Sequence, residues 1–338
     1  ESRGLGDVYK RQNIQVDPAD LPFAAQCTEP MTYCYPPQQN MFQFWTNLTI
    51  DLYGGYFMTP NGNFTNGDMG ENRGHSGGMY ENYYLHIFNN TRRIIAQCDA
   101  SGERGLSGVM RIVQAYGTLM TTDAYGPIPY SSILSGENEV YFEFDSQKDL
   151  YKAMLEDLST AITDISAMGA DEIAKLKSFD CWCNGDKDLW VKIANTMKLR
   201  MALRLSKRET EAGNAGMNLK AIATEAAQNT LATVNKDILI DKSLENEMWL
   251  MFNWGDCGFN ANLVTIMSGT KDPRQPLYMT LNTGDIKNEA GTTTVAANSQ
   301  YLGIRFASGL PAKPNSWGNF SGWIQGNNGS SYSMPLPI

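Results

Sequence analysis

The sequence predicts a mainly α protein: tetratricopeptide-like helix pairs in a solenoid, with a large loop-rich, partly β excursion. Two observations lead to this prediction. Through the first 233 residues, apolar residues recur at steps of three and four in several long segments, which is typical of amphipathic helices. From Val234 onward Asn, Gly, Thr, Trp and Pro become frequent and this periodicity fades.

The predicted elements follow one another along the chain. Residues 13–39 contain five prolines and little periodicity, so we expect an extended or irregular segment there. Apolar spacing then predicts six helices, over 41–57, 79–98, 104–120, 150–165, 188–207 and 217–231. A short extended piece is expected at 140–144, and Ser146 begins an S-x-x-D helix start signal. The helices therefore come as successive pairs, although a strict sequence repeat is absent.

The clearest of these helices is 188–207, DLWVKIANTMKLRMALRLSK. Its apolar residues share one face: Trp190, Ile193, Ala194, Met197, Met201 and Leu205. Acidic residues stand at its start and Lys207 at its end, which suits the helix dipole. By itself this pattern indicates an amphipathic core helix.

The helix over 104–120 ends at the segment Asp123-Ala124-Tyr125-Gly126-Pro127-Ile128-Pro129-Tyr130. Gly126 can adopt the left-handed conformation that closes a helix, and Pro127 cannot continue one. We therefore expect a structural turn here and not a catalytic loop.

Residues 59–78, TPNGNFTNGDMGENRGHSGG, are rich in Gly, Asn and Asp and are expected to form a loop. The segment is long for a connection, and loops of this length are either functional or disordered. It carries side chains that could stack on or hydrogen-bond a polar ligand, among them Phe64, Asn72 and Arg73.

The composition limits the class of protein. The 338 residues are 42% hydrophobic and 11% aromatic, which is typical of a globular chain with a large core. The net charge of -9, without a basic patch beyond the faces of helices, argues against nucleic acid as a partner. No apolar run is long enough to span a bilayer.

Cysteine and histidine usage gives little support for a cofactor or a metal. Six cysteines permit disulfides, but their spacing identifies no pairing. With only two histidines, a histidine-rich metal site is excluded, and no cofactor is expected.

Known catalytic motifs are missing from the sequence as well. Neither histidine has a G-x-S-x-G partner, and no phosphate-binding loop or dinucleotide fingerprint occurs. A glycosidase needs only two carboxylates at a separation that sequence cannot measure, so a helical glycoside hydrolase stays an alternative.

Two segments together resemble one known family. TDAYGPIPYS, within residues 121–132, and ANTMKLRMALRLS, within the helix over 188–207, are similar in order and separation to motifs of the SusD-like (SusD/RagB) outer-membrane nutrient-binding lipoproteins. The resemblance implies a non-catalytic protein on the extracellular face of the outer membrane. It further implies helical repeats hidden behind long insertions and a partner transporter of the SusC-like, TonB-dependent type. The lipid anchor would sit on an N-terminal cysteine that this sequence lacks.

The resemblance also suggests the domain organisation. Residues 1–12, ESRGLGDVYKRQ, resemble an adaptor-derived artefactual leader and are left out of the fold prediction. Residues 13–338 are expected to form a single SusD-like domain, with a helical-repeat part over 13–233 and the loop-rich excursion over 234–338. The family resemblance further suggests that the signal segment and the C-terminal end are missing.

A ligand site is expected where the two loop-rich regions supply aromatic faces and hydrogen-bonding groups. Aromatic rings can cover the C–H faces of sugars, while Asn and Arg satisfy their hydroxyls. The candidate ligand-binding residues are Phe64, Asn72, Arg73, Trp254, Trp317 and Trp323. The leading hypothesis is a starch-binding-type glycan-binding lipoprotein. The alternatives are a peptide-binding member of the family, a glycoside hydrolase, and a helical scaffold with protein partners only.

Overall fold

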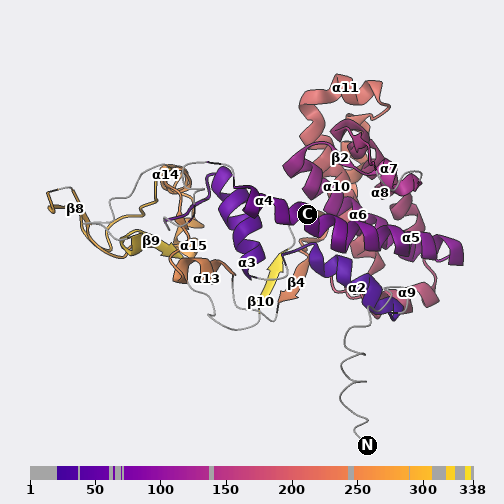
Figure 1. Ribbon diagram of the computed structural model, residues 1–338, viewed down its shortest axis with the longest axis horizontal. Coiled ribbons are helices and arrows are strands. Elements are labelled where there is room, and N and C mark those ends of the chain that lie inside the picture. The colour runs from indigo at the N-terminus through magenta and orange to yellow at the C-terminus, as the bar shows by residue number, and fades with distance from the viewer. Residues whose placement is uncertain are drawn as a thin grey trace, which may run out of the picture. The chain divides into compact units, whose positions relative to one another are not determined.

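The computed structural model describes residues 21–36, 39–60, 64, 70, 72–136, 141–242, 247–288, 290–306, 317–323 and 332–335. It is mainly helical with small two-stranded sheets, which confirms the predicted fold class (Figure 1). Two compact units divide the chain. The helical unit comprises Glu1–Cys34, Tyr83–Ile238 and Leu336–Ile338, and the mixed unit comprises Tyr35–Asn82 and Leu239–Pro335.

The helical unit is built from helices that pack on their neighbours in sequence. Its elements are α2 (Phe23–Tyr33), the π-helical η4 (Tyr83–Phe88), α5 (Asn89–Ser101), α6 (Arg104–Tyr125), β2 (Ile128–Pro129), α7 (Ser131–Ser135), β3 (Phe144–Asp145), α8 (Gln147–Ser166), α9 (Ala170–Lys177), α10 (Lys187–Arg204), η5 (Leu205–Arg208), α11 (Glu209–Asn214), α12 (Leu219–Ala226), η6 (Ala227–Asn229) and η7 (Leu231–Val234). Helix α6 packs against α5 and α8, and α10 packs against α8 and α12. Helices adjacent in sequence therefore lie side by side, as in a solenoid of helix pairs.

Local start signals explain where α8 and α10 begin. The Ser146 hydroxyl accepts a hydrogen bond from the Asp149 backbone N–H at 3.2 Å, so the S-x-x-D prediction is confirmed. At α10, Asp186 Oδ1 accepts from the backbone N–H groups of Asp188 and Leu189, at 3.0 and 3.2 Å. Both caps satisfy backbone donors that the first turn of a helix leaves without partners.

The loop before α10 is organised by one buried carboxylate. Asp180 accepts hydrogen bonds from three backbone N–H groups of this loop, those of Trp182, Cys183 and Gly185. Its Oδ2 also accepts from the indole Nε1 of Trp190 at 2.8 Å. The loop is thereby attached to the first turn of the helix that follows it.

Helix α2 is a difference from the sequence prediction, which expected an irregular segment over 13–39. Pro22 takes the N-cap position, where a missing N–H costs nothing. Pro30 lies inside the helix and is buried together with Gln26, Cys27 and Met31. Packing of this face against η4 and α5 offsets the backbone hydrogen bond that Pro30 cannot donate.

The turn after α6 differs in part from the left-handed closure that its glycine suggests. Gly126 has φ 80° and ψ -134°, so the positive φ is as expected, while ψ lies outside the left-handed helical region. The chain then forms β2, which pairs antiparallel with β3 through Ile128 and Asp145.

The mixed unit combines short helices with two-stranded antiparallel sheets. Its elements are α3 (Gln39–Met41), the π-helical η2 (Phe42–Asp51), β1 (Phe57–Met58), α4 (Arg73–Asn82), β4 (Leu239–Lys242), α13 (Glu247–Asn253), β5 (Gly258–Phe259), α14 (Ala261–Gly269), α15 (Gln275–Tyr278), β6 (Met279–Asn282), β7 (Ile286–Lys287), β8 (Thr293–Val295), η8 (Trp317–Asn319), β9 (Ser321–Trp323) and β10 (Tyr332–Pro335). Strands pair as β1 with β5, β4 with β10, β6 with β9, and β7 with β8.

Helix α4 shortens the loop that the sequence predicts over 59–78, because it already begins at Arg73. Within its described residues, the region after Val234 contains α13 to α15 and the short helix η8 besides its strands. The boundary between helical part and excursion stays a prediction, and residues 1–12 lie outside the described residues.

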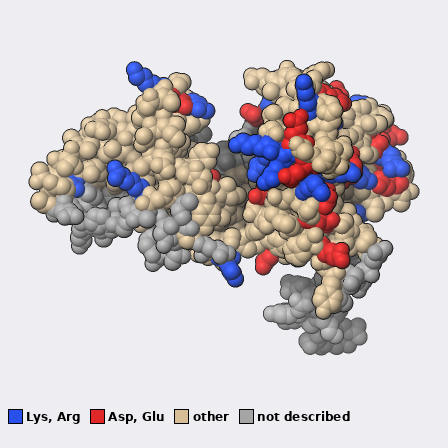
Figure 2. Space-filling view, turned by 90° about the horizontal axis from the view of Figure 1, so that it is seen from above, with Lys and Arg blue, Asp and Glu red and all other residues tan. Residues whose placement is uncertain are grey.

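Charged side chains are unevenly distributed on the face drawn in Figure 2. Figure 2 shows basic and acidic side chains gathered over the helical unit and fewer of them over the mixed unit. Among the helices that the structure describes, none combines the length and apolarity needed to cross a membrane.

Candidate functional site

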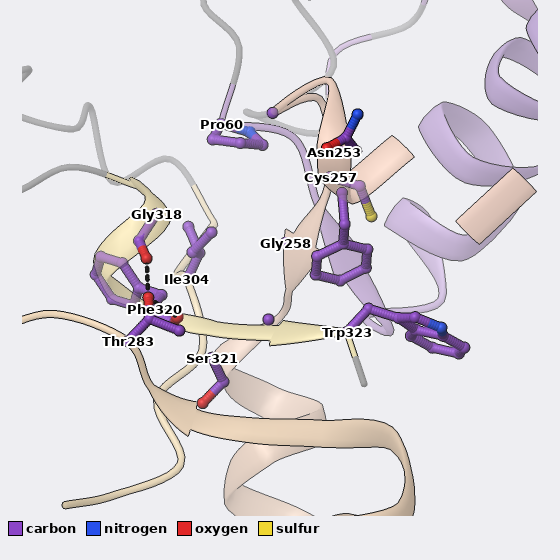
Figure 3. A pocket seen from close by; sticks show the side chains of 13 residues that line it. Pro60, Asn253, Cys257, Gly258, Thr283, Ile304, Gly318, Phe320, Ser321 and Trp323 are labelled. Carbon is purple, nitrogen blue, oxygen red and sulfur yellow. Dashed lines mark hydrogen bonds between the residues drawn. The ribbon is translucent and has the colours of Figure 1, made fainter. Parts of the chain in front are cut away.

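A cavity of about 320 Å³ lies within the mixed unit (Figure 3). Its walls come from the end of α13 and the following turn, from β5, and from the segment that holds η8 and β9. The lining residues are Pro60, Phe252, Asn253, Gly255, Cys257, Gly258, Thr283, Ile304, Gly318, Phe320, Ser321, Gly322 and Trp323.

Strand pairing brings these distant segments together. Strand β5 pairs with β1 so that Phe259 lies opposite Phe57, and β9 pairs with β6 so that Trp323 lies opposite Met279. Phe259 and Met279 are almost completely buried, in a core cluster shared with Val264 and Met267. This core holds the cavity wall in place beneath its lining side chains.

An aromatic cluster forms one wall of the cavity. The Trp323 ring is stacked on Phe259 with centroids 5.9 Å apart and on Tyr278 with centroids 6.3 Å apart. Phe252 lies 6.0 Å from Trp323 and 5.0 Å from Phe259. Trp323 is half-buried and Tyr278 is 42% exposed, so this cluster reaches from the core to the surface.

The polar groups of the lining are uncharged. The exposed amide of Asn253 lies along one side of the cavity with Pro60, and Thr283 and Phe320 lie along another (Figure 3). The Thr283 hydroxyl donates to the carbonyl of Gly318. Hydroxyl and amide groups can each donate and accept, which suits a ligand that carries hydroxyls.

A buried polar layer supports the wall at Cys257. The π-helical segment η2 presents Gln43 and Asn47 one turn apart. Gln43 Nε2 donates to Asp256 Oδ2 at 2.8 Å, and Asn47 Nδ2 donates to Cys257 Sγ at 3.1 Å. Asp51 ends this segment, and burial raises the pKa of its carboxyl to about 7.

The structure separates the three tryptophans that the sequence singles out. Trp323 lines the cavity. Trp254 follows the lining residue Asn253 and is 46% exposed, but its side chain is not part of the lining. The side chain of Trp317 lies outside the described residues.

The three candidates from the first loop lie elsewhere in the mixed unit, and two of them contact His75. The Phe64 ring meets His75 edge-on with centroids 5.9 Å apart, and Asn72 Oδ1 accepts from the His75 backbone N–H at 3.3 Å. Arg73 is exposed at the start of α4. None of the three lines the cavity.

Sequence reasoning missed several lining residues, notably Phe252, Asn253 and Phe320. They lie beside the tryptophans in two aromatic segments, MFNWGDCGF at 251–259 and WGNFSGW at 317–323. The density of aromatic, Asn and Gly residues in these two segments was the available signal. Within the described ranges, no group of three or more His, Cys, Asp or Glu side chains could hold a metal ion.

Comparisons of sequence and structure with known proteins identify one family. The sequence model of the family described as SusD-like, "Susd and RagB outer membrane lipoprotein", matches residues 9–331. A comparison with curated proteins finds no match.

Solved structures of similar fold come from the same family. A SusD-like protein from Bacteroides thetaiotaomicron VPI-5482 is 24% identical with a TM-score of 0.72. A chitin-binding SusD homolog from Flavobacterium johnsoniae is 22% identical with a TM-score of 0.75. Each match covers 93% of this chain and 62% of the other, so this chain spans less than two thirds of their length.

The family match confirms the resemblance that the two sequence motifs indicated. SusD-like proteins are non-catalytic binding proteins of the outer membrane. Because the family match extends over most of its length, this chain belongs to the SusD-like family of SusD and RagB outer membrane lipoproteins.

Proposed function

We propose that the chain is the greater part of a surface lipoprotein that captures oligosaccharide in the cavity of the mixed unit, without catalysing a reaction. The observation that carries this proposal is the composition of the cavity. It joins an aromatic wall, around Trp323 and Phe252, to uncharged hydrogen-bonding groups on the other sides. Pyranose rings carry the same two kinds of surface, because apolar C–H faces alternate with hydroxyls around their edge.

The described geometry fits sugar in size as well as chemistry. A cavity of about 320 Å³ lies at the lower end of the range for small-ligand sites, so it would take one or two sugar units of a longer chain. Tyr278, stacked on Trp323 and 42% exposed, offers an aromatic surface adjoining the cavity for further units.

Relatives support a glycan ligand over a peptide. Two solved structures of similar fold are described as chitin-binding. Starch-type α-glucans and chitin-type oligosaccharides of N-acetylglucosamine are therefore the first two ligands to test. A peptide ligand, the alternative that the sequence left open, is an outcome of the same screen.

The family and its outer-membrane location support a transporter as the partner. Members of the SusD-like family typically pair with SusC transporters. We propose that this protein delivers its ligand to such a TonB-dependent transporter and is anchored through a lipid on an N-terminal cysteine upstream of the present sequence.

Glycan binding can be tested by isothermal titration calorimetry with maltohexaose and chitohexaose after an array screen. Replacing Asn253 by Ala should weaken binding several-fold, because the variant removes an amide at the cavity while leaving the core intact. Replacing Phe320 by Ala should weaken it by a similar factor through lost ring contact.

The matched control is Tyr141→Ala, which removes a 77% exposed aromatic side chain from the helical unit and should leave affinity unchanged. The variant Trp254→Ala tests whether a ring beside the cavity contributes to ligand affinity. The sequence-based expectation is a several-fold loss of affinity. If both cavity variants bind as tightly as the parent protein, the ligand site lies elsewhere. Release of shorter sugars during the titration would contradict a purely binding role.

A further inference from the structure

Among the residues that the structure describes, the lining of the cavity contains no ionisable acid or base apart from the thiol of Cys257. Its polar side chains are Asn253, Thr283 and Ser321, and its glycines contribute backbone groups. The Ser321 hydroxyl accepts from the Leu302 backbone N–H at 2.9 Å, and the Thr283 hydroxyl donates to the Gly318 carbonyl. A charged ligand group would therefore find no counter-charge in the described part of the lining.

The charge directly behind the wall is negative. Asp256 stands between the lining residues Gly255 and Cys257, where it is buried and accepts from Gln43. The Asp256 carboxyl contributes to the raised pKa of the Cys257 thiol, of which burial is the largest cause. An anionic group bound at this wall would lose its water and gain repulsion from the Asp256 carboxylate.

One cation follows the lining in sequence. Arg305 comes directly after Ile304, but its own side chain is exposed and is not part of the lining. Arg305 already has an interaction partner, so a ligand would have to compete for its positive charge. Among the described residues, Arg305 is nevertheless the cation next to the lining in sequence, which makes it the critical variant.

We infer that the cavity selects uncharged sugar units and discriminates against uronic acids, sialic acids and sulfated sugars. This inference rests on the proposed glycan-binding function and narrows it to a class of ligand. Selection arises because the Asn253 amide can donate to and accept from hydroxyl and acetamido groups, and the Thr283 hydroxyl, which donates to Gly318, can still accept. The full cost of desolvating a carboxylate or sulfate would be left without compensation.

The test is an array that pairs neutral and acidic oligosaccharides of equal length, namely maltohexaose, cellohexaose and chitohexaose against hexagalacturonate and a sulfated heparin hexasaccharide. Hits are then titrated at ~0.05 M and ~0.5 M salt, between which Coulombic attraction is strongly screened. We expect binding of neutral chains only, with an affinity that changes less than twofold between the two salt concentrations. The variant Arg305→Gln should retain that affinity.

Three results are distinguishable. Preferred binding of an acidic chain, or an affinity that falls tenfold at high salt, would overturn this inference while supporting the proposed glycan-binding function. Loss of neutral-sugar binding in Arg305→Gln, with an unchanged melting temperature, would overturn it too. Binding of no oligosaccharide in the array would overturn the proposed function, and the inference with it.

Discussion

Arg204 Nη1 lies 3.2 Å from Asp123 Oδ2, and this ion pair joins the end of α10 to the end of α6. Asp123 opens the D-A-Y-G turn, and Arg204 lies in the A-L-R stretch of the other family motif. The two partners differ in burial, because the side chain of Asp123 is 12% exposed and that of Arg204 is 52% exposed. The Tyr151 hydroxyl donates to Asp123 Oδ1 at 2.6 Å and ties α8 to the same carboxylate. The two motifs thus meet at one structural junction of three helices.

Removing the carboxylate should cost more than removing its cation. In Asp123→Ala the Tyr151 hydroxyl loses its acceptor, and we expect a loss of about 1–3 kcal/mol in the free energy of unfolding. In Arg204→Gln only a half-exposed ion pair is lost, which is worth about 0–1 kcal/mol. Urea unfolding measures both.

The control for this comparison is Arg208→Gln. Arg208 pairs with Glu211 at 2.7 Å, but both side chains are well exposed, so stability should not change measurably. If Arg204→Gln destabilised the protein more than Asp123→Ala, the carboxylate would not be the centre of the junction.

The glycine of the same turn gives a second prediction. Gly126→Ala should destabilise the protein by about 1–3 kcal/mol, because φ 80° with ψ -134° is a conformation that residues with a Cβ adopt only under strain. The space around Gly126 is open, so a steric clash is not the cause. The measurement is again the midpoint and slope of urea unfolding.

A matched control exists at Gly169, which also borders a helix in open space but has φ -83° and ψ 174°. Gly169→Ala should therefore have little effect on stability. Equal losses in the two variants would show that the backbone conformation of Gly126 is not what requires glycine.

Much of the helical unit could be predicted from sequence because its determinants are local. Helix α8 has apolar spacing and an N-cap within one segment, and α10 has the same combination. Helix α2 could not be predicted, since its two prolines argue against a helix locally and only packing against η4 and α5 favours it.

The candidate site was less predictable because it depends on long-range pairing. The cavity exists only because β5 pairs with β1 and β9 pairs with β6. Sequence singled out Trp323 as a ligand-binding candidate but could not distinguish a ring in the lining from one beside it, such as Trp254. Nor does sequence show that Phe64 and Asn72 would both contact His75.

Thiol chemistry gives a third prediction. All six cysteines are free in the structure. Cys181 is exposed, Cys34 is half-buried and the other four are buried. Burial of the sulfur and the nearby Asp180 carboxylate raise the pKa of Cys181 to about 11, so little reactive thiolate exists at neutral pH. In native protein, a disulfide reagent such as DTNB should label Cys181 first and slowly, at a rate that rises about tenfold per pH unit up to that value.

Peptide mapping after brief labelling identifies the reactive residue. Cys181→Ser should abolish the first phase, whereas Cys27 and Cys98 should react only after denaturation, because both are fully buried. Early labelling of either buried cysteine would mean that α2 opens readily from its neighbours.

The last prediction concerns pH and the environment of His75. Its imidazole is stacked on Phe44 with centroids 4.5 Å apart, and the Phe64 ring meets its edge. Its Nδ1 is buried without a hydrogen-bond partner among the described residues. Burial lowers the pKa of His75 below the ordinary value of 6.5, because a protonated ring would lose solvation between the two phenyl rings.

The sign of the effect on stability follows from proton binding. With a lower pKa in the folded state, the unfolded chain takes up a proton first as the pH falls below about 6.5. The free energy of unfolding should therefore decrease from there until the folded-state pKa is reached, and be unaffected by this group above pH 7.5. His75→Phe retains a ring for stacking but cannot titrate. The difference between the unfolding free energies of parent and variant, measured from pH 8 to pH 5, therefore isolates the contribution of His75 titration.

Asp51 acts in the opposite direction, because its raised pKa of about 7 costs stability as the pH rises, but it is common to both proteins and cancels in the difference. The same dependence should persist in His86→Gln, which leaves His75 in place. A difference curve that is flat, or that rises toward low pH, would show that His75 is not held neutral by the two phenylalanines.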